Sequence, residues 1–256
     1  ANALSTTADF STSGTYVLRL TGDDSVLNAS DDMTVIVNLP GIGVLSVSGA
    51  APAPNVDLSG EGTADWAHWG LASPTSFNHK SGVTSQIGNY TLIGNGIAQQ
   101  FSGNSTSYSW SGGAPTASAS GVNTGLWIVG AGNGYQIVVP ADTTARTLKM
   151  YVGLWAAGGR FEASLSDGSA PIYVDTTQVS SGSSINRVYT INYQAGSAGQ
   201  TLTVKWTLNT TFNPWSNVTL QAASLGGVPV PLPNQAPLVN AGSDKAIMLP
   251  GSASLS

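Results

Sequence analysis

Tryptophan is the residue of this sequence best suited to binding chemistry, and all seven copies lie in the middle of the chain. Trp110, Trp155 and Trp215 stand beside turn-forming residues, where the backbone of a protein is normally exposed. An indole stacks on the C–H face of a sugar ring, and side chains such as Arg160 and Asn213, near two of these tryptophans, bond to sugar hydroxyls. The pattern predicts a carbohydrate-binding surface, with loop anchoring or a place in the core as the alternative for each ring.

A second group of candidate residues lies in the segment 65–80, which holds both histidines of the chain. Trp66 and Trp69 carry two more indoles, and with His68 they are candidate ligand-binding residues. The alternative is that Trp66, His68 and Lys80 pin a long loop to the edge of a sheet by stacking and hydrogen bonding.

Few residues of this chain are suited to catalysis or to metal binding. Asp65, His68 and His79 could ligate a metal ion, but they form no His-x-x-x-His helix and have no fourth ligand nearby. Asp65 and His68 could join a serine in a triad, although no Gly-x-Ser-x-Gly turn is present. A glycosidase needs two facing carboxylates, and the acids of the central part form no evident pair: Asp57, Glu61, Asp65, Asp142, Glu162, Asp167 and Asp175. The sequence therefore favours a non-catalytic protein, with a hydrolase as the minor alternative.

Two other tryptophans have the surroundings of core residues. Trp127 follows Leu126 and precedes Ile128, and Trp206 ends the alternating run that begins at Leu202. Large aromatic rings inside apolar runs are normally packed between sheets, so both are predicted to be buried.

The composition narrows the class of protein. Charged residues make up only 8% of the chain, far below the roughly 25% usual in soluble globular proteins. A net charge of −5 provides no basic face for nucleic acid, and no run of about 18 apolar residues exists for a membrane span. Zero cysteines exclude disulfides and thiolate chemistry. The first ten residues lack the features of a signal peptide, so we expect the chain to start downstream of any export signal.

Short runs of β-branched and aromatic residues, broken by Gly, Asn, Asp or Pro about every 8–12 residues, predict an all-β fold. The central part is expected to be a jelly-roll-like antiparallel β-sandwich, and no window has the periodicity of a helix. Near the start of the chain, alternation in 14–21 and in 32–38 predicts two paired antiparallel strands. The clearest central strands are predicted at 126–130, 135–139, 147–154, 161–165, 172–174, 187–193, 201–208 and 217–222.

Both ends of the chain resemble parts of a known family. The segments 3–10, 14–21 and 30–35 resemble the last strands of polycystic-kidney-disease (PKD) type immunoglobulin-like domains, and residues 234–245 resemble the opening of one. The resemblance predicts four regions: the end of a PKD-type domain in 1–40, a central module in 44–226, a proline-rich linker in 227–233 and the start of a second PKD-type domain in 234–256.

The resemblance also implies a setting for the chain. The segments 62–70 and 77–80 resemble a module found beside PKD-type domains in large secreted bacterial proteins, and the strand pattern is similar to carbohydrate-binding modules by architecture alone. It implies a secreted or cell-surface bacterial protein with neighbouring PKD-type domains, whose incomplete ends could associate head to tail. Asp23–Asp24 and Asp31–Asp32 could bind a structural Ca²⁺, or could be solvated loop acids. The function predicted is polysaccharide binding, and the alternative is a structural or adhesive repeat of a stalk or filament.

Overall fold

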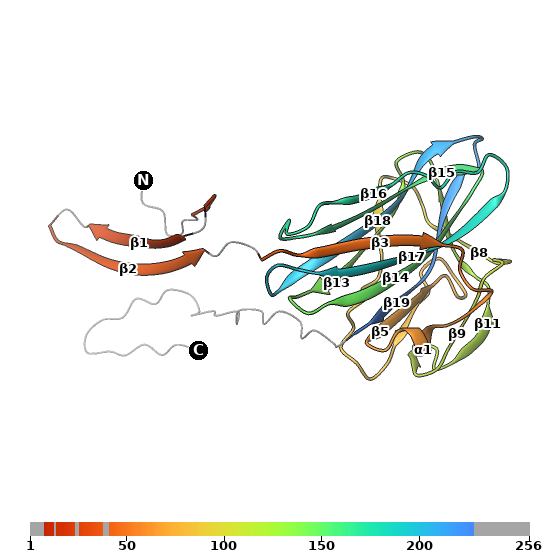
Figure 1. Cartoon of the computed structure of the whole chain (residues 1–256), viewed down its shortest axis with the longest axis horizontal. Helices are drawn as coiled ribbons and strands as arrows, with labels where there is room; N and C mark the ends of the chain where they lie inside the picture. Colours follow the sequence, from red (N-terminus) through yellow and green to blue (C-terminus); the bar gives the residue numbers. More distant parts are fainter. Residues whose placement is uncertain (1–7, 13, 24–25, 38–40, 228–256) are drawn as a thin grey trace, which may run out of the picture.

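The structure is a computed structural model that describes residues 8–12, 14–23, 26–37 and 41–227. The described chain is almost entirely β-strand, as Figure 1 shows, and the predicted all-β sandwich is confirmed. The one described helix, α1 (Leu58–Glu61), is a single turn that the sequence did not predict. The carboxylate of Asp57 caps it by accepting a hydrogen bond from the Ser59 N–H. A single turn is too short to leave a periodic apolar pattern, so it carries no sequence signal.

The largest sheet has nine strands and provides one layer of the sandwich. Along its main path the strands are β10 (Gly113–Ala114), β6 (Phe77–Lys80), β5 (Asp65–Trp69), β19 (Asn217–Gly226), β14 (Arg146–Trp155), β17 (Ser184–Gln194) and β3 (Val44–Ala50). Two further strands, β12 (Gly125–Val129) and β8 (Gln99–Phe101), extend from β19, so β12 and β5 share one edge of that strand.

The second layer is a five-stranded antiparallel sheet. Its strands are, in order, β16 (Tyr173–Asp175), β15 (Ala157–Leu165), β18 (Gln200–Thr211), β13 (Gly134–Ala141) and β7 (Thr91–Ile93). Alternate residues of both large sheets meet in one hydrophobic core, which includes Met150, Ile191, Trp206 and Leu220. Burial of this apolar surface is the main force that holds the two sheets together.

A small third sheet covers part of the opposite face of the nine-stranded sheet. It contains β11 (Ala119–Val122), β9 (Ser107–Trp110) and β4 (Asn55–Asp57), and β4 runs parallel to β9. A second core lies there, with Trp66, Tyr108, Trp110 and Tyr151 among its members. The nine-stranded sheet is therefore apolar on both faces where the small sheet covers it. The face that points away from the five-stranded sheet is its outer face, and the small sheet leaves the rest of that face uncovered.

The predicted N-terminal strand pair is confirmed as the hairpin β1 (Gly14–Asp23) and β2 (Asn28–Val37). Within the described residues it forms a separate two-stranded sheet. Every predicted central strand also corresponds to an observed one, from β12 through β19. The sandwich strands begin at Val44 and end at Gly226. The predicted linker after Gly227 and the second PKD-type segment lie outside the described residues.

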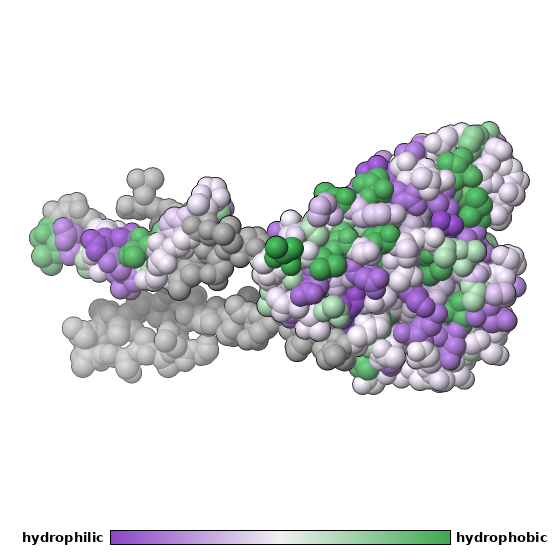
Figure 2. All heavy atoms as spheres, viewed as in Figure 1, coloured by the Kyte–Doolittle hydropathy of each residue, from purple (hydrophilic) through white to green (hydrophobic). Residues whose placement is uncertain are grey.

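The surface of the sandwich reflects the low charge of the chain. Figure 2 shows many pale spheres, neither strongly hydrophobic nor strongly hydrophilic, over the visible face. No helix in the described part of the chain is long and apolar enough to cross a membrane.

Candidate functional site

A pocket of about 420 Å³ opens on the outer face of the nine-stranded sheet. Three of the seven tryptophans line it, namely Trp127, Trp155 and Trp215. The other lining residues are small, apolar or uncharged polar: Phe101, Ser102, Gly103, Asn104, Ser105, Leu154, Ser184, Asn186, Asn217 and Thr219. No Lys, Arg, His, Asp or Glu is among them.

Strand register places the pocket floor on two neighbouring rows of the sheet. In the first row Trp127 of β12 lies opposite Thr219 of β19, followed by Gly153 of β14 and Asn186 of β17. In the second row Asn217, Trp155 and Ser184 lie side by side. Residues two apart on a strand face the same way, whereas the alternate positions, such as Ile128 and Val218, belong to the main core.

Gly153 lets its neighbours approach closely in the middle of the first row. A Cβ atom there would lie 2.7 Å from Thr219 Oγ1 and 2.8 Å from Asn186 Oδ1. From the core side, the Trp206 Nε1–H donates to the Gly153 carbonyl at 3.0 Å. The floor is thus held from below by a buried indole, and two polar oxygens converge over it from either side.

One wall of the pocket is the loop that follows β8. Asn186 Nδ2 donates to Asn104 Oδ1 at 2.5 Å and to Ser105 Oγ at 2.8 Å, which ties this loop to the sheet. The facing wall carries Trp215, 66% exposed, in the turn before β19. Fixed walls of this kind reduce the ordering that a ligand would otherwise have to impose.

Side chains around Trp215 fix its turn. Ser216 Oγ accepts from the Phe212 and Asn213 N–H groups and donates to the Ala156 carbonyl. Asn213 Oδ1 accepts from the Trp215 N–H at 2.8 Å, so Asn213 shapes the turn and does not line the pocket. Ala156 has φ +46°, which is the only positive φ of a non-glycine residue in the described chain. Backbone strain of this type is concentrated at functional sites, and here it turns the chain immediately after Trp155.

The structure brings together two of the three predicted loop tryptophans. Trp155, 36% exposed, and Trp215 share the pocket, but Trp110 is only 3% exposed in the second core. Trp110 was predicted to be a loop residue, yet it ends strand β9 and donates its indole N–H to the Thr116 carbonyl. Its turn-forming neighbours belong to the bends beside a strand, not to an exposed loop.

Trp127 was predicted to be buried in the core, and this prediction is wrong. It is half-buried and lines the pocket, although its apolar run suggested the core. Its neighbours Leu126 and Ile128 take the core-facing positions of the strand, so alternation turns Trp127 outward. Strict alternation within that short run was the signal that could have found it. The prediction for Trp206 is confirmed, since it is fully buried.

The predicted ligand-binding residues of segment 65–80 are buried as well. Trp66, Trp69 and His68 have no exposed surface, so none of them meets a ligand from solvent. Trp66 packs against Trp110 in a tilted arrangement with a centroid distance of 5.6 Å, and Trp69 stacks on Phe77. All five residues of β5 are buried because both faces of this strand are covered. An alternating pattern predicts only one buried face, so it could not indicate this.

His68 lies between aromatic rings instead of among metal ligands. Burial lowers its pKa to about 4, against a small opposing effect of the Thr124 backbone, so the imidazole is neutral near pH 7. Asp65 is engaged by the backbone N–H groups of Trp66, Gln86 and Ile87. No group of three His, Asp or Glu side chains among the described residues could hold a metal ion, so the Asp65–His68–His79 alternative is wrong.

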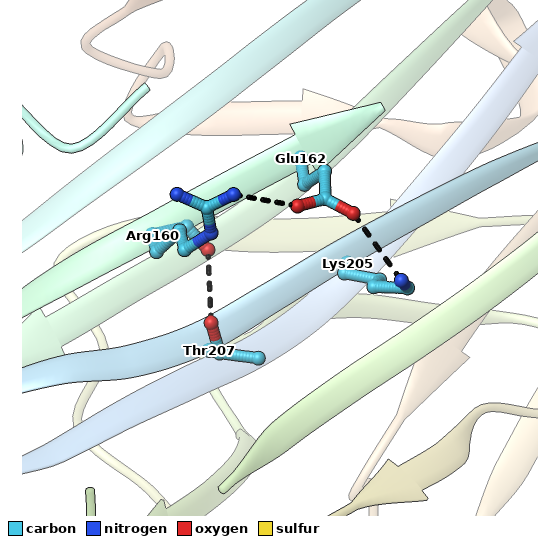
Figure 3. A network of polar contacts seen from close by, with 4 residues as sticks. All are labelled: Arg160, Glu162, Lys205 and Thr207. Carbon is cyan, nitrogen blue, oxygen red and sulfur yellow. Dashed lines mark hydrogen bonds and ion pairs between the residues drawn. The ribbon is translucent and has the colours of Figure 1, made fainter. Parts of the chain in front are cut away.

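Arg160 lies on the five-stranded sheet, outside the pocket lining. Figure 3 shows its guanidinium beside Glu162, with an Nη2–Oε2 distance of 2.7 Å, and Lys205 on the other carboxylate oxygen at 3.2 Å. The hydrogen bond from Arg160 has the largest effect on the pKa of Glu162 and lowers it, although burial acts to raise that pKa. Arg160 is therefore occupied by an ion pair, and its closeness to Trp155 in sequence does not extend to the pocket.

The predicted calcium ligands lie in or beside the hairpin. Asp32 is bound by Arg19 across the two strands at 2.7 Å, and this hydrogen bond lowers the pKa of Asp32. Asp24 is outside the described residues, and the side chain of Asp23 is not described either. An arginine on Asp32 occupies the carboxylate that a calcium ion would need.

The chemistry that this pocket can perform is binding by shape, stacking and neutral hydrogen bonds. Its lining offers no general acid, base or nucleophile pair, because it contains no titratable side chain. Comparison with protein-family models, with curated proteins and with solved structures returns no match.

Proposed function

We propose that this protein binds carbohydrate without catalysis, through the pocket on the outer face of the nine-stranded sheet. The observation that carries the proposal is the convergence of Trp127, Trp155 and Trp215 around one pocket whose remaining lining is neutral. Indole faces stack on the C–H faces of sugar rings, and amide and hydroxyl groups match sugar hydroxyls. A pocket of about 420 Å³ lies within the range typical of small-ligand sites.

We expect Trp155→Ala and Trp215→Ala to weaken glycan binding about 10- to 100-fold, because truncation of an aromatic anchor removes most of its contact area. The measurement is retention of the protein on a panel of soluble and insoluble polysaccharides, followed by titration of the retained glycan against intrinsic fluorescence. Phe212→Ala is the matched control, since Phe212 is an exposed ring in the Trp215 turn that does not line the pocket. Unchanged retention in both tryptophan variants would refute the proposal.

The proposed setting is a secreted or cell-surface bacterial protein, in which the module attaches its parent protein to polysaccharide beside PKD-type domains. The low charge and the Gly-, Ser- and Thr-rich composition support this setting. The assignment of residues 1–40 to the end of a PKD-type domain rests on the sequence resemblance and is part of this proposal.

A second candidate function, a structural repeat in a stalk or filament, is favoured by the hairpin. Tyr16, Leu18 and Leu20 lie on one face of β1, opposite Val35 and Met33 of β2. Met33 is 59% exposed, and an isolated hairpin is marginally stable in water. This apolar face is suited to a neighbouring chain, and we propose that head-to-tail association of two copies covers it.

Sedimentation over a range of concentrations tests this association. We expect a dimer or longer assembly for the full chain, and a monomer for Met33→Lys, which places a charge on the apolar face. Val17→Lys is the control, because Val17 is similarly exposed but lies on the opposite face beside Arg19. A monomer at every concentration for the unaltered chain would count against the structural role.

A further inference from the structure

The floor of the pocket holds two oxygens whose hydrogen-bonding capacity is incomplete. Thr219 Oγ1 accepts from Gln221 Nε2 at 2.6 Å, so its hydroxyl proton is left to be donated. The Asn186 Nδ2 group donates its two hydrogen bonds to the Asn104–Ser105 loop. Its Oδ1 accepts a hydrogen bond from no described residue. Both oxygens lie within 3 Å of the point where Gly153 lacks a side chain, at 2.7 Å and 2.8 Å.

One donor and one acceptor side by side match a hydroxyl group, which can accept from Thr219 and donate to Asn186 at once. A carboxylate has only acceptors and would face Asn186 Oδ1 with a repulsive oxygen. An ammonium has only donors and would leave the Thr219 proton unpaired. Burial of either ion is unfavourable without a partner of opposite charge, and the lining contains none.

Four of the six cationic side chains of the sandwich are engaged elsewhere. Lys149 pairs with Glu61, and Arg160 and Lys205 pair with Glu162. Lys80 donates to the Gly62 and Thr63 carbonyls, which holds the loop after α1. The other two, Arg146 and Arg187, do not line the pocket either, so none of the six can compensate an acidic ligand there without rearrangement.

We propose that the pocket selects neutral sugar units, and that Thr219 and Asn186 recognise one sugar hydroxyl in the space above Gly153. This inference rests on the proposed carbohydrate-binding function and names its ligand class. A Cβ at Gly153 would push these two oxygens apart, so the glycine keeps them close enough for one hydroxyl to bridge them and is a specificity-determining position.

Retention is compared on three classes of polysaccharide: neutral glucans, xylans, mannans and galactans; the acidic polygalacturonate, alginate and hyaluronan; and cationic chitosan. We expect at least about tenfold weaker binding of the charged classes at matched ionic strength. Acidic or cationic polysaccharide bound as tightly as the best neutral one would overturn the inference and leave the proposed function standing. Absence of binding to every member would overturn the proposed function itself.

Two variants test the floor directly with the neutral glycan that binds. Thr219→Val keeps the β-branched shape without the hydroxyl and should weaken binding about 5- to 10-fold, whereas Thr219→Ser should restore it. Thermal unfolding of both variants separates a binding effect from loss of the Gln221 hydrogen bond. Equal affinity of Thr219→Val and the unaltered protein would overturn the assignment, as would failure of Thr219→Ser to bind better than Thr219→Val.

Discussion

Trp206→Ala is expected to lower the free energy of unfolding by about 3–5 kcal/mol, the range for truncating a fully buried aromatic side chain. Trp206 is 1% exposed, packs near Tyr189, and donates its indole N–H to the Gly153 carbonyl. The substitution therefore removes core contacts and the support below the pocket floor together. Urea unfolding followed by far-ultraviolet circular dichroism measures the change, and a loss below about 1 kcal/mol would contradict this account of the core.

Gly159 provides a matched test of the same packing. A Cβ at this position would lie 1.9 Å from Trp206 Cη2, so Gly159→Ala should destabilise the protein by about 1–3 kcal/mol through overpacking. In the Trp206→Ala background the clash is gone, and the same substitution should be nearly neutral. Gly182→Ala is the control, because nothing lies within 4 Å of a Cβ there. Additive effects of Gly159→Ala and Trp206→Ala would show that the two residues do not interact as described.

His68 is expected to make the stability of the protein depend on pH. Its pKa is lowered to about 4 by burial, from the usual 6.5, so the unfolded chain binds a proton that the folded chain excludes. Stability is then complete above about pH 6.5 and falls as the pH decreases toward 4, by about 3 kcal/mol in all. The free energy of unfolding measured in urea at intervals of half a pH unit gives this slope.

The matched variants separate His68 from the other ionisable groups. His68→Gln should abolish the slope between pH 6.5 and 4, whereas His79→Gln should preserve it. Asp167 and Asp175 act at lower pH: burial raises their pKa values, but hydrogen bonds from Ser169 and from Thr177 and Tyr189 outweigh it, so both are lowered. Their contribution is present above about pH 4 and is lost below it. A slope that persists unchanged in His68→Gln would assign it to other residues.

Local sequence determined the hairpin strands and the strands β12 to β19, whereas the strands β3 to β11, most of them short, were not individually predicted. The run 147–154, for example, alternates so strongly that it fits β14 (Arg146–Trp155) to within a residue at each end. The hairpin β1–β2 could also be predicted, because its two alternating runs are separated by the segment 22–31, whose Gly, Asp, Ser and Asn residues favour a turn. Such signals depend on the period of two within one strand, and they need no knowledge of distant partners.

Tertiary structure decided which tryptophans reach solvent. Trp110 and Trp215 have similar turn-forming neighbours, yet the small third sheet includes one of them and the turn before β19 exposes the other. Trp127 joins Trp155 only through β19, which pairs with both β12 and β14. Arg160, five residues after Trp155, lies on the other sheet because the strained turn at Ala156 directs the chain there.

The sequence by itself determined the all-β class, the positions of the hairpin strands and of β12 to β19, and the supply of indoles for a binding site. Strand order and register determined the site, because side chains far apart in the sequence become neighbours only when strands pair. The close approach of Thr219 and Asn186 over Gly153 is a property of three paired strands and of no single one.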